Sequence, residues 1–231
     1  MTVDAAQAAL DVVLTDTNVK VVEAWRSAFA DTPGVRIRKG SLLTVRADAW
    51  VSPTNARGLM NGGVDAAVKQ HLGAGIQLRV QRAIRDEFAG RLPIGSAVCV
   101  RSGAANPTYL ISTPTMQESS ENVSETLNVA LACAAAFQAI HRKNSEEPGA
   151  IRSVALVGMG ARTGRVPAQV CANLMWTGHT LFQEYEFDDY DELRATVLAQ
   201  LADIESAPAG ERVRITPPER GRTPGPRPTG R

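Results

Sequence analysis

Two glycine-containing segments of this chain carry residue types that could bind a phosphorylated sugar. The first holds Asn55, the pair Gly62-Gly63, and Asp65 ten residues after Asn55. An amide side chain can hydrogen-bond sugar hydroxyls, and glycine lets the backbone approach a ligand closely. A helix that begins at Val64 would present free N–H groups at its start, with a carboxylate in its first turn. The first segment therefore predicts a site for phosphates and ribose oxygens.

The second segment is a glycine-rich loop that follows an apolar stretch. The stretch Ser153–Val157 predicts a buried strand, and the loop Gly158–Gly164 comes directly after it. Successive backbone N–H groups in such a loop can wrap a diphosphate, which larger side chains would obstruct. Arg162 either pairs with that diphosphate or lies in solvent. Because both loops follow strands, we expect them to line one crevice at the carboxyl ends of the strands.

The remaining pattern alternates between strands and helices. Asp16, Thr17 and Asn18 are placed to cap one helix, and Asn122 or Ser124 lies near the start of another. The predicted strands are 9–14, 35–38, 48–51, 97–100, 109–112 and 153–157, and the predicted helices are 19–29, 64–71, 76–88, 124–141, 168–184 and 191–204. This order favours the α/β class, with a mixed, mostly parallel sheet covered by helices on both faces.

Length and composition fit one folded domain followed by a tail. The chain has 231 residues, 44% of them apolar, and we expect a domain over 8–205. The segment 206–231 holds six of the thirteen prolines, six arginines and two glutamates. Its net charge is therefore +4, whereas the whole chain has a net charge of +1. Such a composition predicts disorder and, as one option, contact with acidic surfaces. A solubilising or vestigial tail is the alternative.

Targeting and metal signals are missing from the pattern. No apolar run is long enough for a membrane span, and the first residues lack a basic signal-peptide region. Cys99, Cys133 and Cys171 are widely spaced in apolar surroundings, which indicates buried thiols in a reducing compartment rather than a zinc site. We therefore expect a cytoplasmic protein that uses no metal and contacts no membrane.

Four short motifs carry a resemblance to one family. The Ser52–Asn55 tetrapeptide, the Asn61-Gly62-Gly63 turn, the Val64-Asp65 helix start and the loop 158–167 resemble the two ligand loops of macrodomains. The resemblance covers roughly residues 10–182 and is nearest to a bacterial and phage branch. It implies a three-layer α/β/α fold and binding of ADP-ribose, free or attached to a macromolecule. No organic cofactor is implied.

The resemblance also implies a role for each matching residue. Asn55 would hold the distal ribose, and Asp65, as in hydrolytic members, would orient or activate a water near the anomeric carbon. Ser41 and Leu42 would lie beside the adenine. The other implied ligand contacts are Ser52, Asn61, Gly62, Gly63, Val64, Gly158, Met159, Gly160, Ala161, Arg162, Thr163 and Gly164.

The chain departs from the family pattern at several of these positions. Ser41 stands where members often have an adenine-contacting Asp, and Lys69 stands where a His often follows the catalytic Asp. The second loop is longer than in many hydrolases and lacks an aromatic residue found there.

These departures leave three hypotheses open. The chain is a metal-independent hydrolase of ADP-ribosyl bonds, of the ADP-ribosylhydrolase or O-acetyl-ADP-ribose deacetylase type. Alternatively, it is a non-catalytic reader or a phage-associated interaction module, or a scaffold without a nucleotide ligand. A dinucleotide fold and a P-loop do not fit, because no acidic strand follows Gly158-x-Gly160 and no Gly-Lys-Ser/Thr is present.

Overall fold

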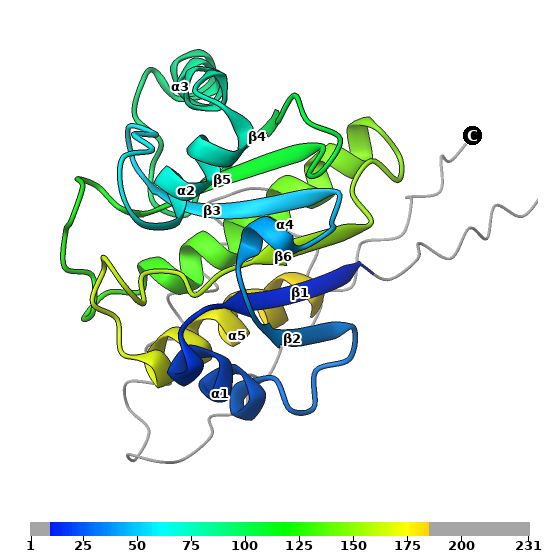
Figure 1. Ribbon diagram of the computed structural model, residues 1–231, viewed down its shortest axis with the longest axis vertical. Helices are drawn as coiled ribbons and strands as arrows, with labels where there is room; N and C mark the ends of the chain where they lie inside the picture. The colour runs from blue at the N-terminus through cyan, green and yellow to red at the C-terminus, as the bar shows by residue number, and fades with distance from the viewer. Residues whose placement is uncertain (1–9, 185–231) are drawn as a thin grey trace, which may run out of the picture.

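A single six-stranded sheet organises the computed structural model, which describes residues 10–184 (Figure 1). Its strands run in the order β2-β1-β6-β3-β5-β4, and every neighbouring pair is parallel except β4 with β5. The strands are β1 (Asp11–Asp16), β2 (Val35–Lys39), β3 (Ala49–Asn55), β4 (Val98–Arg101), β5 (Tyr109–Met116) and β6 (Ser153–Leu156). The predicted mixed, mostly parallel sheet is confirmed.

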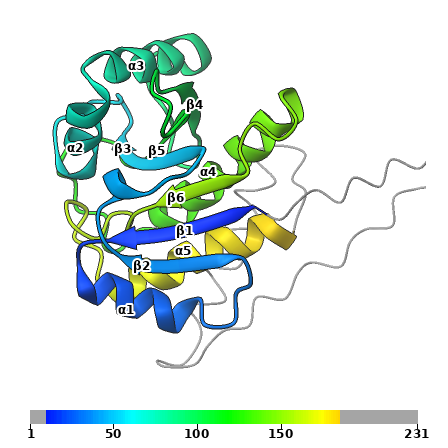
Figure 2. The same ribbon diagram turned by 45° about the vertical axis from the view of Figure 1, so that its right-hand side comes forward.

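Helices cover both faces of this sheet and complete three layers (Figure 2). One face packs against α1, α4 and α5, and the other packs against α2, α3 and the 3₁₀ turn η1. The helices are α1 (Val19–Ala28), α2 (Gly63–Leu72), α3 (Gly75–Phe88), α4 (Asn128–Glu146) and α5 (Ala168–Glu184), and η1 spans Leu42–Thr44. The apolar core is thus divided by the sheet into two clusters, as the α/β class requires.

Helix α1 shows how local sequence places an element at the site edge. The Asn18 side chain accepts a hydrogen bond of 3.0 Å from the Lys20 N–H, as expected for a helix cap. Val21, Val22 and Trp25 are fully buried along one side of the helix and face the sheet. The cap and this apolar face fix the turn between β1 and α1, which borders the site.

Strands β3 and β5 are longer than predicted, because polar residues and prolines continue them. The predictions ended these strands at Val51 and Ser112, whereas β3 reaches Asn55 and β5 reaches Met116. A proline removes a backbone donor and normally disrupts a strand that is paired on both sides. β3 after Trp50 and β5 after Ser112, however, pair only with each other. Each of these segments has one unpaired edge, so Pro53 and Pro114 are tolerated there.

The one-sided pairing of β3 also opens the sheet. β3 pairs with β6 only at Ala49 and Trp50, and the rest of β3 has β5 as its only paired neighbour. The carboxyl ends of β3 and β6 are therefore not joined. In parallel sheets, a gap of this kind between strand ends is where ligands bind.

The predicted start of the long helix was wrong. Helix α4 begins at Asn128 rather than Ser124, and its N-cap, Leu127, makes no side-chain hydrogen bond. The Asn122 side chain instead accepts from the Ser124 N–H at 3.1 Å, which closes a turn before the helix.

Two predictions fall on residues that the structure does not describe, the helix 191–204 and the tail 206–231. No helix within 10–184 is long and apolar enough to cross a membrane.

Candidate functional site

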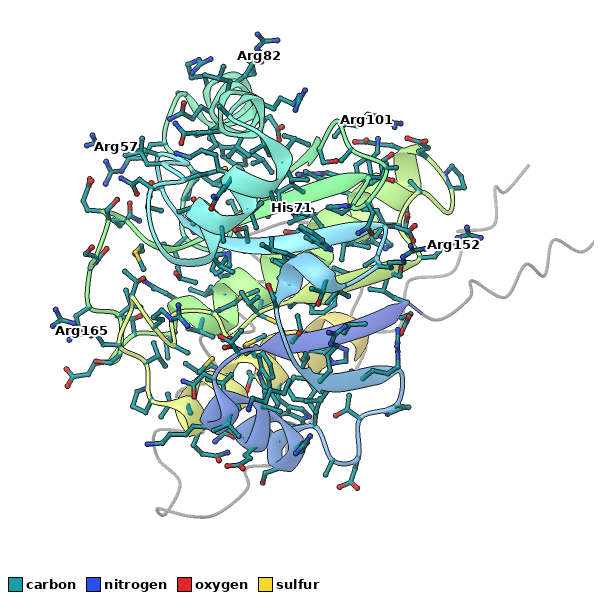
Figure 3. All side chains as sticks on the ribbon, viewed as in Figure 1. Arg57, His71, Arg82, Arg101, Arg152 and Arg165 are labelled. Carbon is teal, nitrogen blue, oxygen red and sulfur yellow. The ribbon has the colours of Figure 1, made fainter. Side chains whose placement is uncertain are left out.

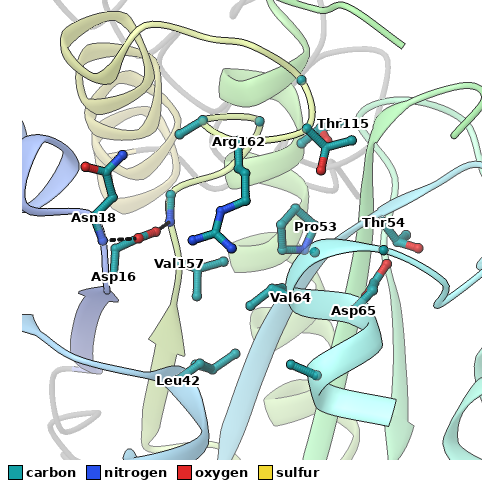
Figure 4. A pocket seen from close by; sticks show the side chains of 18 of the residues that line it. Asp16, Asn18, Leu42, Pro53, Thr54, Val64, Asp65, Thr115, Val157 and Arg162 are labelled. Atoms are coloured by element: carbon teal, nitrogen blue, oxygen red, sulfur yellow. Dashed lines mark hydrogen bonds between the residues drawn. The ribbon is translucent and has the colours of Figure 1, made fainter. Parts of the chain in front are cut away.

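A cavity of about 390 Å³ lies at the carboxyl edge of the sheet, in the gap between β3 and β6 (Figure 4). Its walls come from segments that follow β1, β2, β3, β5 and β6, and from the first turn of α2. The predicted residues that line it are Ser41, Leu42, Asn55, Asn61, Gly62, Gly63, Val64, Asp65, Gly158, Gly160, Ala161, Arg162, Thr163 and Gly164. The two glycine loops therefore do share one crevice.

Ser52 and Met159 are the two predicted ligand contacts that do not line the cavity. Both side chains are fully buried. Ser52 lies behind the wall and donates a hydrogen bond to the Asp65 carboxylate. Met159 packs in the core beneath the second loop, and its carbonyl accepts a bond of 3.2 Å from the Cys171 thiol. Their side chains support the wall rather than form its surface.

Asp65 occupies the first turn of α2, and only 4% of its surface is exposed. Burial raises the pKa of Asp65 to about 7, and this rise is opposed by the Ser52 and Thr54 hydroxyls and by the charge of Lys69. A carboxyl group with a pKa near neutrality can take up a proton and release it at neutral pH. Asp65 is thus suited to general-base chemistry as well as to accepting a hydrogen bond.

Asn55 spends most of its hydrogen-bonding capacity on its own loop. Its Oδ1 accepts from the Arg57 and Leu59 N–H groups at 3.1 and 3.2 Å, and its Nδ2 donates to the Leu59 carbonyl at 2.9 Å. The second Nδ2 hydrogen faces the Ser119 hydroxyl at 3.4 Å, which is a weak contact. A sugar hydroxyl could replace Ser119 at that hydrogen without disturbing the loop.

The glycines of the first loop bring it close to the second loop. Gly63 has a φ of 56°, and a Cβ added there would lie 3.5 Å from the Thr163 Oγ1. The two loops therefore approach each other across the cavity. Gly62 differs, since its backbone is extended and a Cβ there would meet nothing within 4 Å. A side chain at position 62 would project into open space at the start of α2.

Packing within the second loop accounts for its own glycines. A Cβ on Gly164 would lie 2.7 Å from a Val123 methyl carbon, and one on Gly160 would lie 3.0 Å from Val166. Real Cβ atoms do not approach other atoms at 2.7 Å, so a side chain at position 164 would force the loop or Val123 to shift. Substitutions at these two positions would therefore confuse a loss of folding with a loss of binding.

Asp16, which the sequence predicted only as a helix-capping residue, anchors the second loop. Its Oδ2 accepts from the Gly158 N–H at 3.1 Å, and its Oδ1 accepts from the Asn18 N–H at 2.8 Å. Figure 4 shows both bonds at the cavity wall. The sequence feature that could have indicated this role is the position of Asp16 at the carboxyl end of β1.

Further lining residues were not predicted either. They lie at or just after the carboxyl ends of β1, β3 and β5, and include Thr15, Thr17, Asn18, Thr54, Thr115, Ser119 and Ser120.

Arg162 supplies a positive charge at the cavity. Its guanidinium reaches towards the Thr17 hydroxyl at 3.5 Å, and no carboxylate of residues 10–180 forms an ion pair with it. Figure 3 places Arg57 and Arg165 at the same edge of the molecule, with Arg101 and Arg152 at the opposite edge. Arg57 is bound to Glu118 at 3.3 Å, and Arg165 does not line the cavity. Arg162 is thus placed to pair with an anionic ligand.

Ser41 and Leu42 form the far wall. The Ser41 side chain accepts from the Leu43 N–H at 3.2 Å and caps η1, while Leu42 is buried. Within the described residues, no group of three or more histidine, cysteine, aspartate or glutamate side chains could hold a metal ion.

Comparisons with known proteins bear on the whole arrangement. The chain is 34% identical over 142 residues to an uncharacterized protein of Aquifex aeolicus. This match covers 61% of this chain and 78% of that protein. It is 32% identical over 128 residues to an uncharacterized protein of Aeropyrum pernix, which covers 55% of this chain and 61% of that protein.

Solved structures with a similar fold include the Oceanobacillus iheyensis macrodomain with ADP, at a TM-score of 0.51 and 16% identity over 71% of this chain and 90% of that one. The same macrodomain with MES bound matches with a TM-score of 0.50 and 14% identity over the same shares. The Macro domain family matches residues 51–175, which is more than half of the sequence. The chain belongs to the macrodomain family.

Proposed function

We propose that the cavity binds ADP-ribose, free or as the group carried by a modified macromolecule. The observation that carries this proposal is the meeting of two loops around one cavity, with Arg162 and the open start of α2 on its wall. Backbone N–H groups at a helix start, and a guanidinium that has no ion-pair partner among residues 10–180, favour phosphate oxygens. The Oceanobacillus iheyensis macrodomain was solved with ADP, and a mutant of it with ADPR, which supports the same ligand class here.

We propose hydrolysis of an ADP-ribosyl bond as the activity. Water would attack the anomeric carbon of the distal ribose, the bond to the leaving group would break, and Asp65 would take a proton from the water. The pKa of Asp65, raised by burial to about 7, supports this role because the ionised form is available near neutral pH. Release of ADP-ribose from a modified protein or nucleic acid would test it.

A non-catalytic reader is the second candidate, and two contacts favour it. The Lys69 ammonium donates to the Gln77 side chain at 3.1 Å and does not line the cavity. The Asn55 amide is largely used by its own loop. Binding of ADP-ribose without release from any modified substrate would support the reader. Contact of the tail with acidic surfaces, and a cytoplasmic location, stay proposals.

Arg162→Ala is expected to weaken ADP-ribose binding about tenfold, which corresponds to about 1.4 kcal/mol. The reason is the loss of the guanidinium that would pair with the diphosphate, and the difference should shrink at high salt. Calorimetric titration measures it. Arg165→Ala is the matched control, because Arg165 is exposed in the same loop but outside the cavity lining. Equal losses in the two variants would contradict the placement of the phosphates.

A further inference from the structure

The hydrogen bond between Ser52 and Asp65 joins the sheet to the first turn of α2. Its two residues are 13 positions apart in the sequence, and they are 0% and 4% exposed. The Ser52 hydroxyl donates to the Oδ1 atom of the Asp65 carboxylate. A hydrogen bond in a buried, poorly polarisable environment is electrostatically stronger than the same bond in water. The bond therefore holds one of the two oxygens of the carboxylate that the proposed reaction uses.

The strand end of this bond is held firmly. Ser52 lies within the ladder of β3 and β5, where it is aligned with Ser112, and the next pair is Pro53 with Thr113. A serine side chain has one heavy-atom torsion, which is restricted to the staggered positions, so a fixed backbone limits where the hydroxyl can lie. Ser52 thus offers a hydroxyl at a position that the sheet determines.

The helix end of the bond has fewer local restraints. The N-cap of α2 is Gly62, which has no side chain to accept a capping hydrogen bond, and the next residue, Gly63, has a φ of 56°. Glycine gives the backbone more freedom than other residues, and a capping side chain would normally stabilise a helix start. The bond from Ser52 supplies a restraint to the first turn of α2 from outside the helix.

The two residues lie on opposite sides of the cavity wall. Asp65 lines the cavity, whereas Ser52 does not. The Oδ1 atom is directed at Ser52 behind the wall, which leaves Oδ2 for contact with a ligand or a water. Figure 4 shows Asp65 beside Thr54, the next residue of β3 on the same face of the strand as Ser52. The strand therefore orients the carboxylate from one side.

The same contacts affect the charge of the carboxylate. Burial raises the pKa of Asp65 to about 7, and the Ser52 and Thr54 hydroxyls act against this rise. A hydrogen bond donated to the ionised form favours that form. The charged groups of the surroundings are Lys69 of α2, which also lowers the pKa, and Arg162, which lines the same cavity. Loss of the Ser52 hydroxyl should therefore leave fewer molecules with an ionised Asp65 near neutral pH.

We infer that Ser52 is a positioning residue for Asp65, which holds Oδ1 behind the cavity wall and leaves Oδ2 as the oxygen that takes the proton from the attacking water. This inference rests on the proposed function, in which Asp65 accepts that proton. Ser52 does not touch the ligand, so a substitution at position 52 acts on the reaction through Asp65.

The test follows the protonation of Asp65 directly. Carbon-13 NMR titration of its carboxyl carbon in the ligand-free protein should show a midpoint at higher pH in Ser52→Ala than in the wild type. Turnover of an ADP-ribosylated protein by this variant should be about tenfold lower at about pH 6. The loss should be much smaller at about pH 9, where the carboxyl group is ionised in both proteins. A purely structural role of Ser52 would give the same loss at both pH values.

Ser112→Ala is the matched control on the neighbouring strand. Ser112 is aligned with Ser52 and fully buried, and its hydroxyl has no hydrogen-bond partner in the part of the chain that the structure describes. This variant should leave the midpoint of Asp65 unchanged. Ser52→Thr keeps a hydroxyl and should retain the midpoint and the pH profile of the wild type. If Ser52→Ala fails to fold, Ser52→Cys gives the same comparison, because a thiol is a weaker donor of similar size.

Three outcomes would contradict the positioning role. They are an unchanged midpoint in Ser52→Ala, an equal shift in Ser112→Ala, and a loss of turnover that does not depend on pH. A wild-type protein that neither binds ADP-ribose nor releases it would instead overturn the proposed function. The NMR midpoints need no ligand, so they would still decide whether Ser52 controls the protonation of Asp65.

Discussion

Gly62→Asp is expected to reduce ADP-ribose affinity at least about 100-fold, or about 2.7 kcal/mol. Gly62 lines the cavity at the start of α2, where the first backbone N–H groups of the helix would face the phosphates of the proposed ligand. The new carboxylate would occupy this space and repel the diphosphate. Two like unit charges about 4 Å apart repel by about 4 kcal/mol at an effective dielectric constant of about 20, so the expected loss is within this effect.

The same substitution should leave folding intact, which is why position 62 gives a sharper test than the second loop. Gly62 is the N-cap of α2, with φ −150° and ψ 159°, and its added Cβ would meet nothing within 4 Å. Aspartate is a favoured N-cap residue and differs from glycine there by only a few tenths of a kcal/mol. The unfolding temperature of the variant should therefore be close to that of the wild type.

Two controls separate charge from other effects in this experiment. Gly62→Ser places a neutral capping side chain at the same position and should lose much less affinity. Gly75→Asp adds a carboxylate to the exposed first residue of α3, outside the cavity lining, and should bind ADP-ribose as the wild type does. Normal affinity in Gly62→Asp would show that the start of α2 does not face the phosphates.

Asp65→Asn is expected to have the second large effect, and it acts on stability and turnover in opposite directions. Burial raises the pKa of Asp65 from 3.8 to about 7 in the folded protein. The folded state therefore holds this proton more tightly than the unfolded state, and the free energy of unfolding falls as the pH rises from about 4 to about 7. Above pH 7 the full cost of burying the charge is present. Asparagine keeps an oxygen that can accept from Ser52 and has no charge to bury.

The expected gain in the free energy of unfolding is about 1–3 kcal/mol at pH 8 and close to zero at pH 4. A difference of about 3 between two pKa values corresponds to at most about 4 kcal/mol, which structural relaxation reduces. Denaturant unfolding at the two pH values measures it. The same variant should bind ADP-ribose but lose at least about 99% of any hydrolytic turnover, because the proton acceptor is gone.

Asp86→Asn, which removes an exposed carboxylate on α3, is the control for this pH series. A pH-independent effect of Asp65→Asn on stability would contradict the buried carboxylate, and unchanged turnover would exclude its catalytic role.

The elements that the sequence predicted best are those with a clear amphipathic pattern or a turn signal. The helices α1 and α3 were predicted to within one residue, because apolar residues recur on one face and Asn18 caps α1. The start of α4 was not predicted because its run of alanines is buried on all sides, so the sequence shows no amphipathic pattern there. In addition, neither Asn122 nor Ser124 caps the helix.

The sequence predicted those parts of the candidate site whose place in the fold follows from a local motif. Both glycine loops line the cavity, since each follows a strand and parallel strands end at one edge. Thr54 and Thr115 were missed because their place depends on how β3 and β5 pair beyond Pro53 and Pro114, a long-range property. For the same reason, Asp16 could not be joined to Gly158 from sequence, as 142 residues separate them.

Calorimetric titration of the wild-type protein with ADP-ribose tests the central claim most directly, with ADP, AMP and NAD as comparators. The account predicts saturable binding of ADP-ribose at micromolar concentration, about −8 kcal/mol, with ADP and AMP weaker. Absence of saturable binding to ADP-ribose would contradict the proposed ligand and leave a macrodomain whose cavity serves another purpose.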